Sequence, residues 1–384
     1  MDFSIYFKPI QSVDFEDHTL GSLANMHDEF GFPDLEGVKI AIIGVKDSRG
    51  CALGGDYNNG IDIIRTELYA LFHHQIDIPI ADLGNIEQGA SLNDTYHAVA
   101  DVVQDLNKKG IFALILGGSQ DLTYANYLAY EKLEQTINLA VIDDTIDFGN
   151  DQDEINSNNF LSKIILHQPN YLFNCSSIGY QTYLNSPVSK KLMDDLFFDS
   201  YRLGEIQSNI AHGEPALRNA DILSIDVSSI RSGEFQGKKI AGPNGFYGEE
   251  ICQLMRYAGI SDKLSSLGIY EYYSENDLDF ASAKLIAQML WCAIDGICSR
   301  KKDFPAGTKD NYIRYRIHLE NTEHELVFYK SDKSDRWWMD VPYPPNKILK
   351  FERHHLVPCN YSDYQKASEG IMPDLWWKTY QKLN

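Results

Sequence analysis

Five short apolar runs recur along the chain, separated by stretches long enough to form helices. The runs cover residues 38–44, 111–118, 138–143, 221–226 and 267–272. Ile, Val and Leu occupy successive positions in them, as is typical of parallel strands buried on both faces. Between the runs, stretches such as 61–73 and 94–109 carry apolar residues at helical spacing. This alternation predicts a doubly wound α/β fold, in which helices cover both faces of a mainly parallel sheet.

Most of the predicted strands end in polar or acidic residues. In an open parallel sheet, ligands bind at the carboxyl ends of the strands. Taken singly, each of these residues is best explained as part of a turn, but four strand ends that carry acids favour a pocket. The residues that the sheet would bring to this edge are Ser119, Gln120, Asp143, Asp147, Asp226 and Glu271.

The C-terminal part of the chain has a different pattern. Apolar and polar residues alternate over 312–319, which predicts a half-buried strand, and 325–330 would return as its hairpin partner. Two tryptophan pairs follow, at 337–338 and 376–377. Packing against the main domain is the favoured explanation for them, because aromatic side chains bury a large area. A protein-interaction surface is the alternative.

The charge of the chain is unevenly distributed. The formal net charge is −21, yet residues 301–384 carry 14 Lys and Arg against 12 Asp and Glu. An acidic body and a nearly neutral tail indicate different regions. We predict an N-terminal segment over 1–37, an α/β domain over 38–300 and an aromatic-rich extension over 301–384. The acidic balance argues against nucleic acid as a partner, because phosphate binding requires a clustered cationic surface.

The sequence indicates neither a membrane span nor a disulfide framework. The most apolar helical stretch, 283–298, contains Gln288 and Asp295 and is too short to cross a bilayer, so we expect a buried helix. The six cysteines include no Cys-x-x-Cys pair, and reduced thiols in a cytoplasmic protein are the expectation. The acidic stretches 82–85 and 147–154 lack the calcium-loop pattern and are expected to be solvated loops.

Several motifs occur in a characteristic order between about residues 38 and 300. They are IIGVKD at 42–47, NNGIDIIRTEL at 58–68, Asp-Leu-Gly at 82–84, AGPNGFYGEE at 241–250 and GIYEYYSEND at 268–277. In these motifs the sequence resembles the ureohydrolase superfamily, which comprises arginase, agmatinase and formimidoylglutamase. The resemblance implies an arginase-like fold and a homo-oligomer. It also implies that Glu271 binds the guanidinium or amidine end of a ligand.

The resemblance further implies a two-metal centre, in which two Mn²⁺ ions are bridged by a hydroxide that they activate. Six side chains hold these ions in the family. Three of the aligned positions keep the family's aspartates, namely Asp143, Asp147 and Asp226. The other three are substituted, with Gln120 and Thr145 in place of histidines and Ser228 in place of an aspartate.

The remaining donors suit one weakly held divalent cation, Mn²⁺ or Mg²⁺, because they are all oxygens. A second ion, and with it the bridging hydroxide, is not expected. Without any metal the clustered carboxylates would repel one another. At least one of them should then titrate abnormally high, unless Arg231 or a lysine neutralises them.

Three hypotheses about function follow. We favour a catalytically impaired or inactive homologue that acts as a binding or scaffold protein through its acidic pocket, with a protein partner on the aromatic tail. The first alternative is an active metal-dependent hydrolase of a C–N bond in a linear guanidino or formimidoyl compound. The second is a sensor that binds an arginine-like molecule through Glu271 and the spare carboxylates.

Overall fold

A large sheet forms the centre of the protein. The computed structural model describes residues 3–11, 14–150, 152–240, 242–305, 309–319, 324–344 and 351–384. Within them, ten strands form this sheet, in the spatial order β1-β4-β3-β5-β10-β9-β6-β7-β8 with β2 beside β4. The strands are β1 (Phe7–Lys8), β2 (Ala24–Met26), β3 (Ile40–Lys46), β4 (Ile80–Glu87), β5 (Phe112–Leu116), β6 (Ile137–Ile142), β7 (Leu172–Tyr180), β8 (Asp199–Arg202), β9 (Ile222–Asp226) and β10 (Ser266–Tyr270). Neighbouring strands run parallel, except that β1 is antiparallel to β4.

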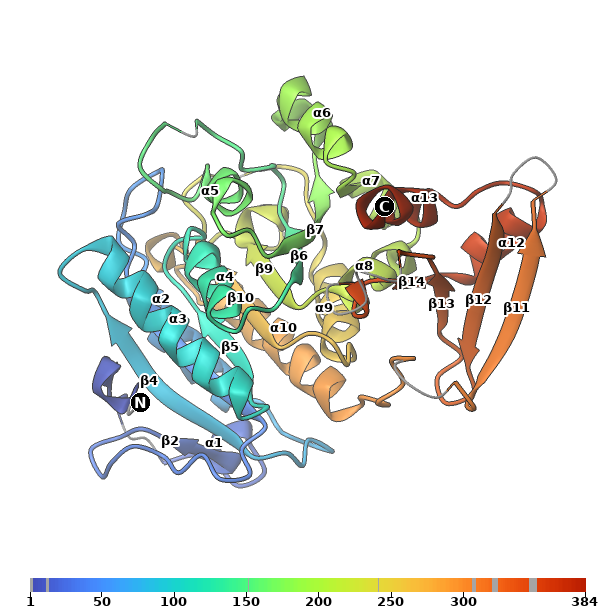
Figure 1. The fold of residues 1–384 in the computed structure, drawn as a ribbon. Helices are drawn as coiled ribbons and strands as arrows, with labels where there is room; N and C mark the ends of the chain where they lie inside the picture. Colours follow the sequence, from blue (N-terminus) through green and yellow to red (C-terminus); the bar gives the residue numbers. More distant parts are fainter. Residues whose placement is uncertain are drawn as a thin grey trace.

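Helices cover both faces of this sheet (Figure 1). On β3, Ile40 and Ile42 pack into one apolar core and Ala41 and Ile43 into the other, so the strand is buried on both sides. The first core includes α2, α9 and α10, and the second includes α3, α4 and α5. The helices around the sheet are α1 (Leu20–Leu23), α2 (Asn58–Tyr69), α3 (Leu92–Lys108), α4 (Leu122–Lys132), α5 (Phe160–Leu166), α6 (Pro187–Asp195), α7 (Leu203–Ser208), α8 (Glu214–Asn219), α9 (Gly248–Gly259) and α10 (Ala281–Cys298).

The fold class predicted from the sequence is confirmed. All five apolar runs are strands, and they form β3, β5, β6, β9 and β10. The apolar runs did not reveal β4 and β7, because polar residues interrupt both strands. In β7, Asn174 and Ser176 are buried and hydrogen-bonded to each other (3.2 Å), and Asn174 also donates to Asp199 on β8.

The acidic stretch 82–85 is not the solvated loop that we expected. It lies in β4, and Asp82 is fully buried. Arg65 of α2 pairs with its carboxylate through Nε (2.7 Å) and Nη2 (3.1 Å), and Tyr69 donates a further hydrogen bond. Arg65 also donates to Asn85 Oδ1 and to the Gly84 carbonyl. A buried charge is tolerated here because its partner and its hydrogen bonds are supplied by the next element.

The C-terminal part forms a second, antiparallel sheet in the order β11-β12-β13-β14. The predicted hairpin is present: Tyr312 on β11 lies opposite Ser331 on β12, and His318 opposite Glu325, while its turn at 320–323 lies outside the described residues. The elements of this part are β11 (Tyr312–His318), β12 (Glu325–Ser331), β13 (Trp337–Asp340), β14 (Leu356–Cys359), α12 (Tyr361–Ser368) and α13 (Asp374–Leu383).

Polar side chains attach this second sheet to the main one. Arg218 of α8 donates to the carbonyl oxygens of Trp337 and Cys359, each at 3.2 Å, and its guanidinium lies 4.5 Å from the ring centre of Trp338. From α13, Lys382 donates to Asn174 of β7 at 2.6 Å. Three of the four tail tryptophans are buried, and Trp377 is 45% exposed. Figure 1 shows β11 to β13 to one side of the main sheet.

Helix α10 is longer than the sequence indicated. It begins at Ala281, and its 18 residues, with a mean hydropathy of 1.2, meet the length and composition of a membrane-crossing helix. The expectation that this stretch is too short to span was therefore wrong. It is the one such helix among the described residues, and 61% of it is buried. Because α10 packs against α2 and α9, this burial is that of a core helix.

Substitution of Arg65 by Leu should destabilise the protein strongly. The change leaves Asp82 as a buried charge without its cation, which costs about 3–5 kcal/mol. Arg256→Leu is the matched control. Arg256 pairs with Asp295 at 2.9 Å but its side chain is 46% exposed, so its loss should cost less than about 1 kcal/mol. Urea denaturation measures both free energies of unfolding, and equal losses would contradict this account of β4.

Candidate functional site

Four neighbouring strands bring the predicted site residues together. In the sheet, β5, β10, β9 and β6 lie side by side in this order and run parallel. Their carboxyl ends therefore meet at one edge. Gln120 follows β5, Glu271 follows β10, Asp226 ends β9 and Asp143 follows β6. Asp147 comes from the same loop as Asp143, and both are buried.

The loop after β6 carries two carboxylates that share one hydroxyl. The Thr145 amide donates to Asp143 Oδ1 at 3.1 Å. The Thr145 hydroxyl lies 2.9 Å from Asp147 Oδ1 and 3.5 Å from Asp143 Oδ1. The Oδ2 atoms of Asp143 and Asp147 are buried and have no hydrogen-bond partner. Each carboxylate thus keeps one oxygen available for a cation.

A short turn after β9 connects Asp226 to this loop. The Ser228 amide donates to Asp226 Oδ1 at 2.6 Å, which caps the 3₁₀ turn at Val227–Ser229. The Ser228 hydroxyl lies 3.2 Å from Asp143 Oδ1 and 3.1 Å from Asp144 Oδ1 and donates to these carboxylates. Ser228 and Thr145, the hydroxyls predicted at ligand positions, both serve here as donors to aspartates.

Glu271 is held by a turn in an uncommon backbone conformation. Its φ of +67° lies in the left-handed region, which costs non-glycine residues about 1 kcal/mol or more. Its own amide donates to the Gly118 carbonyl at 2.9 Å. Its carboxylate accepts from the Gln120 amide (3.1 Å) and from the Cys51 thiol (3.2 Å). The Gln120 side chain turns to Ser224, to which Nε2 donates at 3.3 Å.

The four acids affect one another's ionisation. Burial raises the pKa of Asp147 to about 7, and the same cause, with Asp226 close by, raises the pKa of Glu271 to about 7. Loss of water likewise raises the pKa of Asp226 to about 7. For Asp143, burial and then the charge of Asp147 raise the pKa well above its usual range. This agrees with the expectation that clustered carboxylates without a metal titrate high.

A buried lysine, Lys238, rather than Arg231, interacts with carboxylates of this cluster. Lys238 is 4% exposed, and its ammonium donates to the carbonyls of Ser228 (3.4 Å) and Ile230. Burial lowers the pKa of Lys238, against the opposing effect of Asp144 and Asp226. The Arg231 guanidinium instead lies 4.4 Å from the centre of the Tyr247 ring. The Lys238 ammonium, whose pKa burial lowers, is therefore shared by more than one carboxylate.

The sequence did not single out all residues of this site. Cys51 and Tyr57, which follow β3, are hydrogen-bonded to each other at 3.2 Å and support Glu271, yet no local pattern connects them to it. Ser119 was expected at the site edge, but its hydroxyl donates to Asp121, which Tyr96 also contacts. Burial raises the pKa of Asp121 to about 7. Ser119 thus belongs to a polar cluster with Asp121 and Tyr96, whose Asp121 is affected by the charge of Glu271.

The arrangement suits the binding of a positive charge. Asp143, Asp147, Asp226 and Glu271 converge on one edge, and two of them have buried, unpartnered oxygens. Over the described ranges, no three His, Cys, Asp or Glu side chains are already arranged as a metal site. A cation entering here would have to draw the carboxylates together.

Comparison with known proteins shows which family this chain is related to. A model of the arginase family matches residues 38–295. The formimidoylglutamase of Streptococcus gordonii is 24% identical over 277 residues, which cover 67% of this chain and 84% of that protein. The formimidoylglutamase of Macrococcus caseolyticus is 26% identical over 276 residues, covering 66% and 84%.

Solved structures have the same fold. The structure of Trypanosoma cruzi formiminoglutamase with Mn²⁺ superposes with a TM-score of 0.65 at 18% identity, covering 74% of this chain and 100% of that one. Formimidoylglutamase from Bacillus subtilis gives a TM-score of 0.67 at 17% identity, covering 78% and 99%. Since the family model spans well over half of its length, the chain belongs to the arginase family.

Proposed function

We propose that this arginase-family protein binds a cation in its acidic pocket and does not carry out two-metal hydrolysis. The observation that carries the proposal is the pair of buried Oδ2 atoms, on Asp143 and Asp147, that have no hydrogen-bond partner. A buried carboxylate oxygen without a partner is costly, and a bound cation would remove that cost. Asp226 and Glu271 add further negative charge at the same edge.

The residues present do not fit a centre of two Mn²⁺ ions. The family resemblance implies a histidine ligand for each ion, and Gln120 and Thr145 stand at the aligned positions. Gln120 offers its amide nitrogen to Ser224, and the Thr145 hydroxyl is used by Asp147. Ser228 supplies a neutral hydroxyl where a carboxylate would bridge. We therefore derive no hydrolytic step through a metal-bound hydroxide.

One small cation is compatible with what remains. Asp143, Asp147 and Asp226 would hold a divalent ion such as Mg²⁺ or Mn²⁺ through oxygens alone, which makes binding weak for Mn²⁺. The same carboxylates, with Glu271, would equally accept the N–H groups of an amidinium or guanidinium. The second case would make the protein a sensor of an arginine-like molecule.

The alternative function is that of an active hydrolase. It is favoured by the comparisons, since the related proteins are formimidoylglutamases, and by the acids retained at the strand ends. Its reaction would be cleavage of a C–N bond in a linear amidine such as a formimidoyl or guanidino compound.

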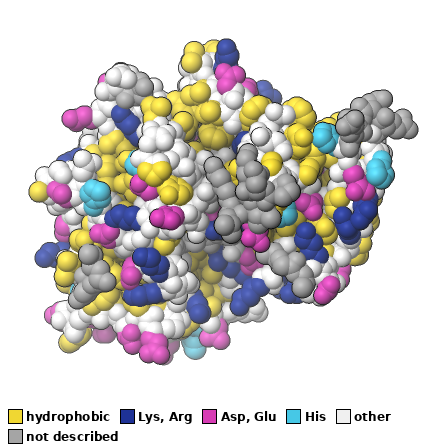
Figure 2. All heavy atoms as spheres, in the orientation of Figure 1, with side chains coloured by type: hydrophobic (Ala, Val, Ile, Leu, Met, Phe, Trp, Pro, Cys, Tyr) yellow, Lys and Arg dark blue, Asp and Glu magenta, His cyan; other side chains and the backbone are white. Residues whose placement is uncertain are grey.

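Other properties belong to the proposal as well. We propose a cytoplasmic homo-oligomer with reduced thiols. The aromatic tail would contact a protein partner through its exposed side chains, of which Trp377 is 45% and Tyr361 53% exposed. On the face shown in Figure 2, acidic and basic side chains are interspersed over both sheets. A mixed surface of this kind favours a protein over nucleic acid as the partner.

Metal content and turnover test the proposal directly. The purified protein should contain at most one Mn²⁺ per chain after incubation with MnCl₂. It should release neither formamide from formimidoylglutamate nor urea from arginine or agmatine. The triple variant Gln120→His, Thr145→His, Ser228→Asp restores the family's donors and should bind more Mn²⁺ than the parent. Mass spectrometry of the metals and product assays measure both quantities.

Two outcomes would contradict the proposal or redirect it. Two equivalents of Mn²⁺ in the parent protein, with formamide or urea released, would establish the hydrolase. Absence of both metal and turnover, with a rise in Tm on adding arginine or agmatine, would favour the sensor. In that case Glu271→Gln should abolish the rise, because the amide keeps the shape and still accepts from Gln120 but carries no charge.

The acid cluster also predicts an unusual pH dependence of stability. The pKa of Asp147 is raised on folding to about 7, so its contribution to stability is complete below an unfolded pKa of about 4 and is lost as the pH rises through 7. Asp147→Asn removes this loss and retains an acceptor for Thr145. With a chelator present, Tm should rise by about 2–5 °C at pH 8 and change little at pH 5.

The control for this prediction is Asp153→Asn, which removes the same charge from an exposed position in the same loop. It should change Tm little at either pH. An equal effect of both substitutions at pH 8 would show that net charge, rather than repulsion inside the site, governs stability.

A further inference from the structure

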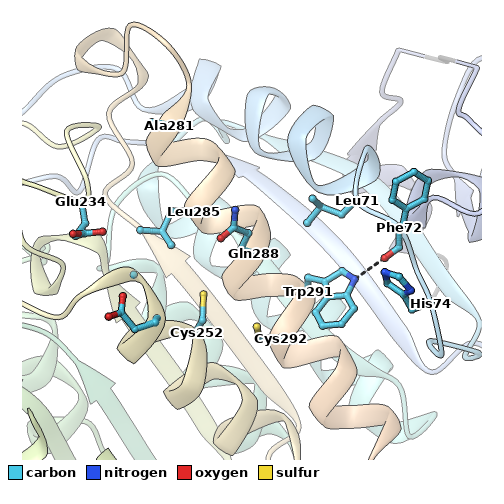
Figure 3. Close-up of a pocket in the computed structure, with 12 residues that line it drawn as sticks. Leu71, Phe72, His74, Glu234, Cys252, Ala281, Leu285, Gln288, Trp291 and Cys292 are labelled. Atoms are coloured by element: carbon cyan, nitrogen blue, oxygen red, sulfur yellow. Dashed lines mark hydrogen bonds between the residues drawn. The ribbon is translucent and has the colours of Figure 1, made fainter.

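A groove of about 790 Å³ lies between α9, α10 and the segment after α2, and none of the candidate site residues lines it. Figure 3 shows Phe72, His74 and Trp291 on one side of it and Glu234 on the other, with Cys252 and Cys292 between. The Trp291 indole donates to the Phe72 carbonyl at 2.9 Å. The volume falls within the range of small-molecule sites, roughly 300–1,000 Å³.

Two cysteines face each other across the helix pair in this groove. Cys252 lies on α9 and Cys292 on α10, both are half-buried, and both line the groove. Their thiols are hydrogen-bonded to each other. Figure 3 shows the two sulfur atoms on adjacent helices, with the groove beside them. The pair is therefore both preassembled and open to a small reagent.

Close helix packing fixes this pair. A Cβ added at Gly259 of α9 would lie 2.2 Å from the Ala293 carbonyl oxygen of α10. One added at Gly296 of α10 would lie 2.7 Å from the Arg256 carbonyl oxygen. Glycine at both positions lets the two backbones approach. Because disulfides tolerate only a narrow range of backbone separations, helices held this close can place two cysteines within bonding reach.

The two thiols differ in reactivity. The hydrogen bond from Cys252 lowers the pKa of Cys292, and the Arg256 guanidinium acts in the same direction, whereas burial and the charge of Asp295 oppose this lowering. The same hydrogen bond, followed by burial, raises the pKa of Cys252. Cys292 is thus the thiol of the pair that ionises more readily, and Cys252 keeps its proton to higher pH. By contrast, burial raises the pKa of Cys175 to about 12, which leaves that thiol unreactive.

We propose that Cys252 and Cys292 are a redox-active pair that a low-molecular-weight disulfide such as glutathione disulfide converts reversibly into a disulfide joining α9 to α10. This inference is independent of the proposed function, since it involves neither the strand-end carboxylates nor a metal. The groove would thus contain a modification site, and its reagents would be small disulfides such as glutathione disulfide.

The reaction proceeds in two exchange steps. The Cys292 thiolate attacks one sulfur of glutathione disulfide, whose S–S bond breaks and releases one glutathione thiolate. Cys252 then loses its proton and attacks the Cys292 sulfur, which releases the second glutathione. Two electrons pass from the cysteines to the reagent, and the two cysteine protons end on two glutathione thiols.

The bond would close a loop that contains β10 and Glu271. Residues 252 to 292 include the whole path from α9 through this strand to α10. A crosslink across such a loop restricts the unfolded chain and should raise Tm by several degrees. Cytoplasmic disulfides of this kind are mostly transient and redox-sensing, which agrees with reduced thiols as the resting state.

Thiol trapping on the full-length protein tests the proposal. The reduced protein is equilibrated in buffers of increasing oxidised-to-reduced glutathione ratio, quenched with acid and alkylated with N-ethylmaleimide. Intact mass should show that two of the six cysteines become protected, and peptide mass should identify a link between Cys252 and Cys292. Dithiothreitol should reverse the protection and the rise in Tm.

Variants separate the roles of the two thiols. Cys252→Ser should accumulate one glutathione adduct on Cys292, because no second thiol remains to displace it. In Cys292→Ser all five remaining cysteines should stay open to alkylation. Cys298→Ser, on the same helix, should form the same disulfide as the parent. Six alkylated cysteines in the parent at every ratio, or a link between other cysteines, would overturn the proposal. The parent protein alone decides this, so it does not depend on how the variants fold.

Discussion

Carboxylates that are buried close together must either be neutralised by a cation or take up protons. Four parallel strands of this protein end next to one another, and each brings an acid or its partner to the same edge. Burial and mutual repulsion raise the pKa of Asp143, Asp147, Asp226 and Glu271 together. The local structure around them answers this constraint, since hydroxyls, amides and one buried lysine surround the four side chains.

Neutral donors offset only part of the negative charge. Thr145 and Ser228 donate to Asp143 and its neighbours, and the backbone amide of Gln120 donates to Glu271. The Lys238 ammonium interacts with Asp144 and Asp226, and burial lowers the pKa of Lys238. The acidic cluster therefore has an excess of acceptors over donors. This excess is why we propose a cation as its ligand, and why repulsion in the site should cost stability at alkaline pH.

The acidic cluster and the thiol pair depend on the same two strand–helix units of the main sheet. Helix α9 follows β9 and the turn that carries Ser228, whereas α10 follows β10 and Glu271. The close packing of α9 on α10 brings Cys252 and Cys292 into contact. The acidic cluster and the thiol pair thus lie along the same two strand–helix units of the main sheet.

The sequence by itself determined the five central strands, the helices between them, the C-terminal hairpin and the acids at the strand ends. These features depend on local periodicity and on the rule that parallel strands present their carboxyl ends together. The sequence did not predict β4, where Asp82 is buried against Arg65, or the contact of Cys51 with Glu271. Only the tertiary structure decided these contacts, because the partners lie far apart in sequence and a buried polar group shows no sign of its partner in the residues beside it.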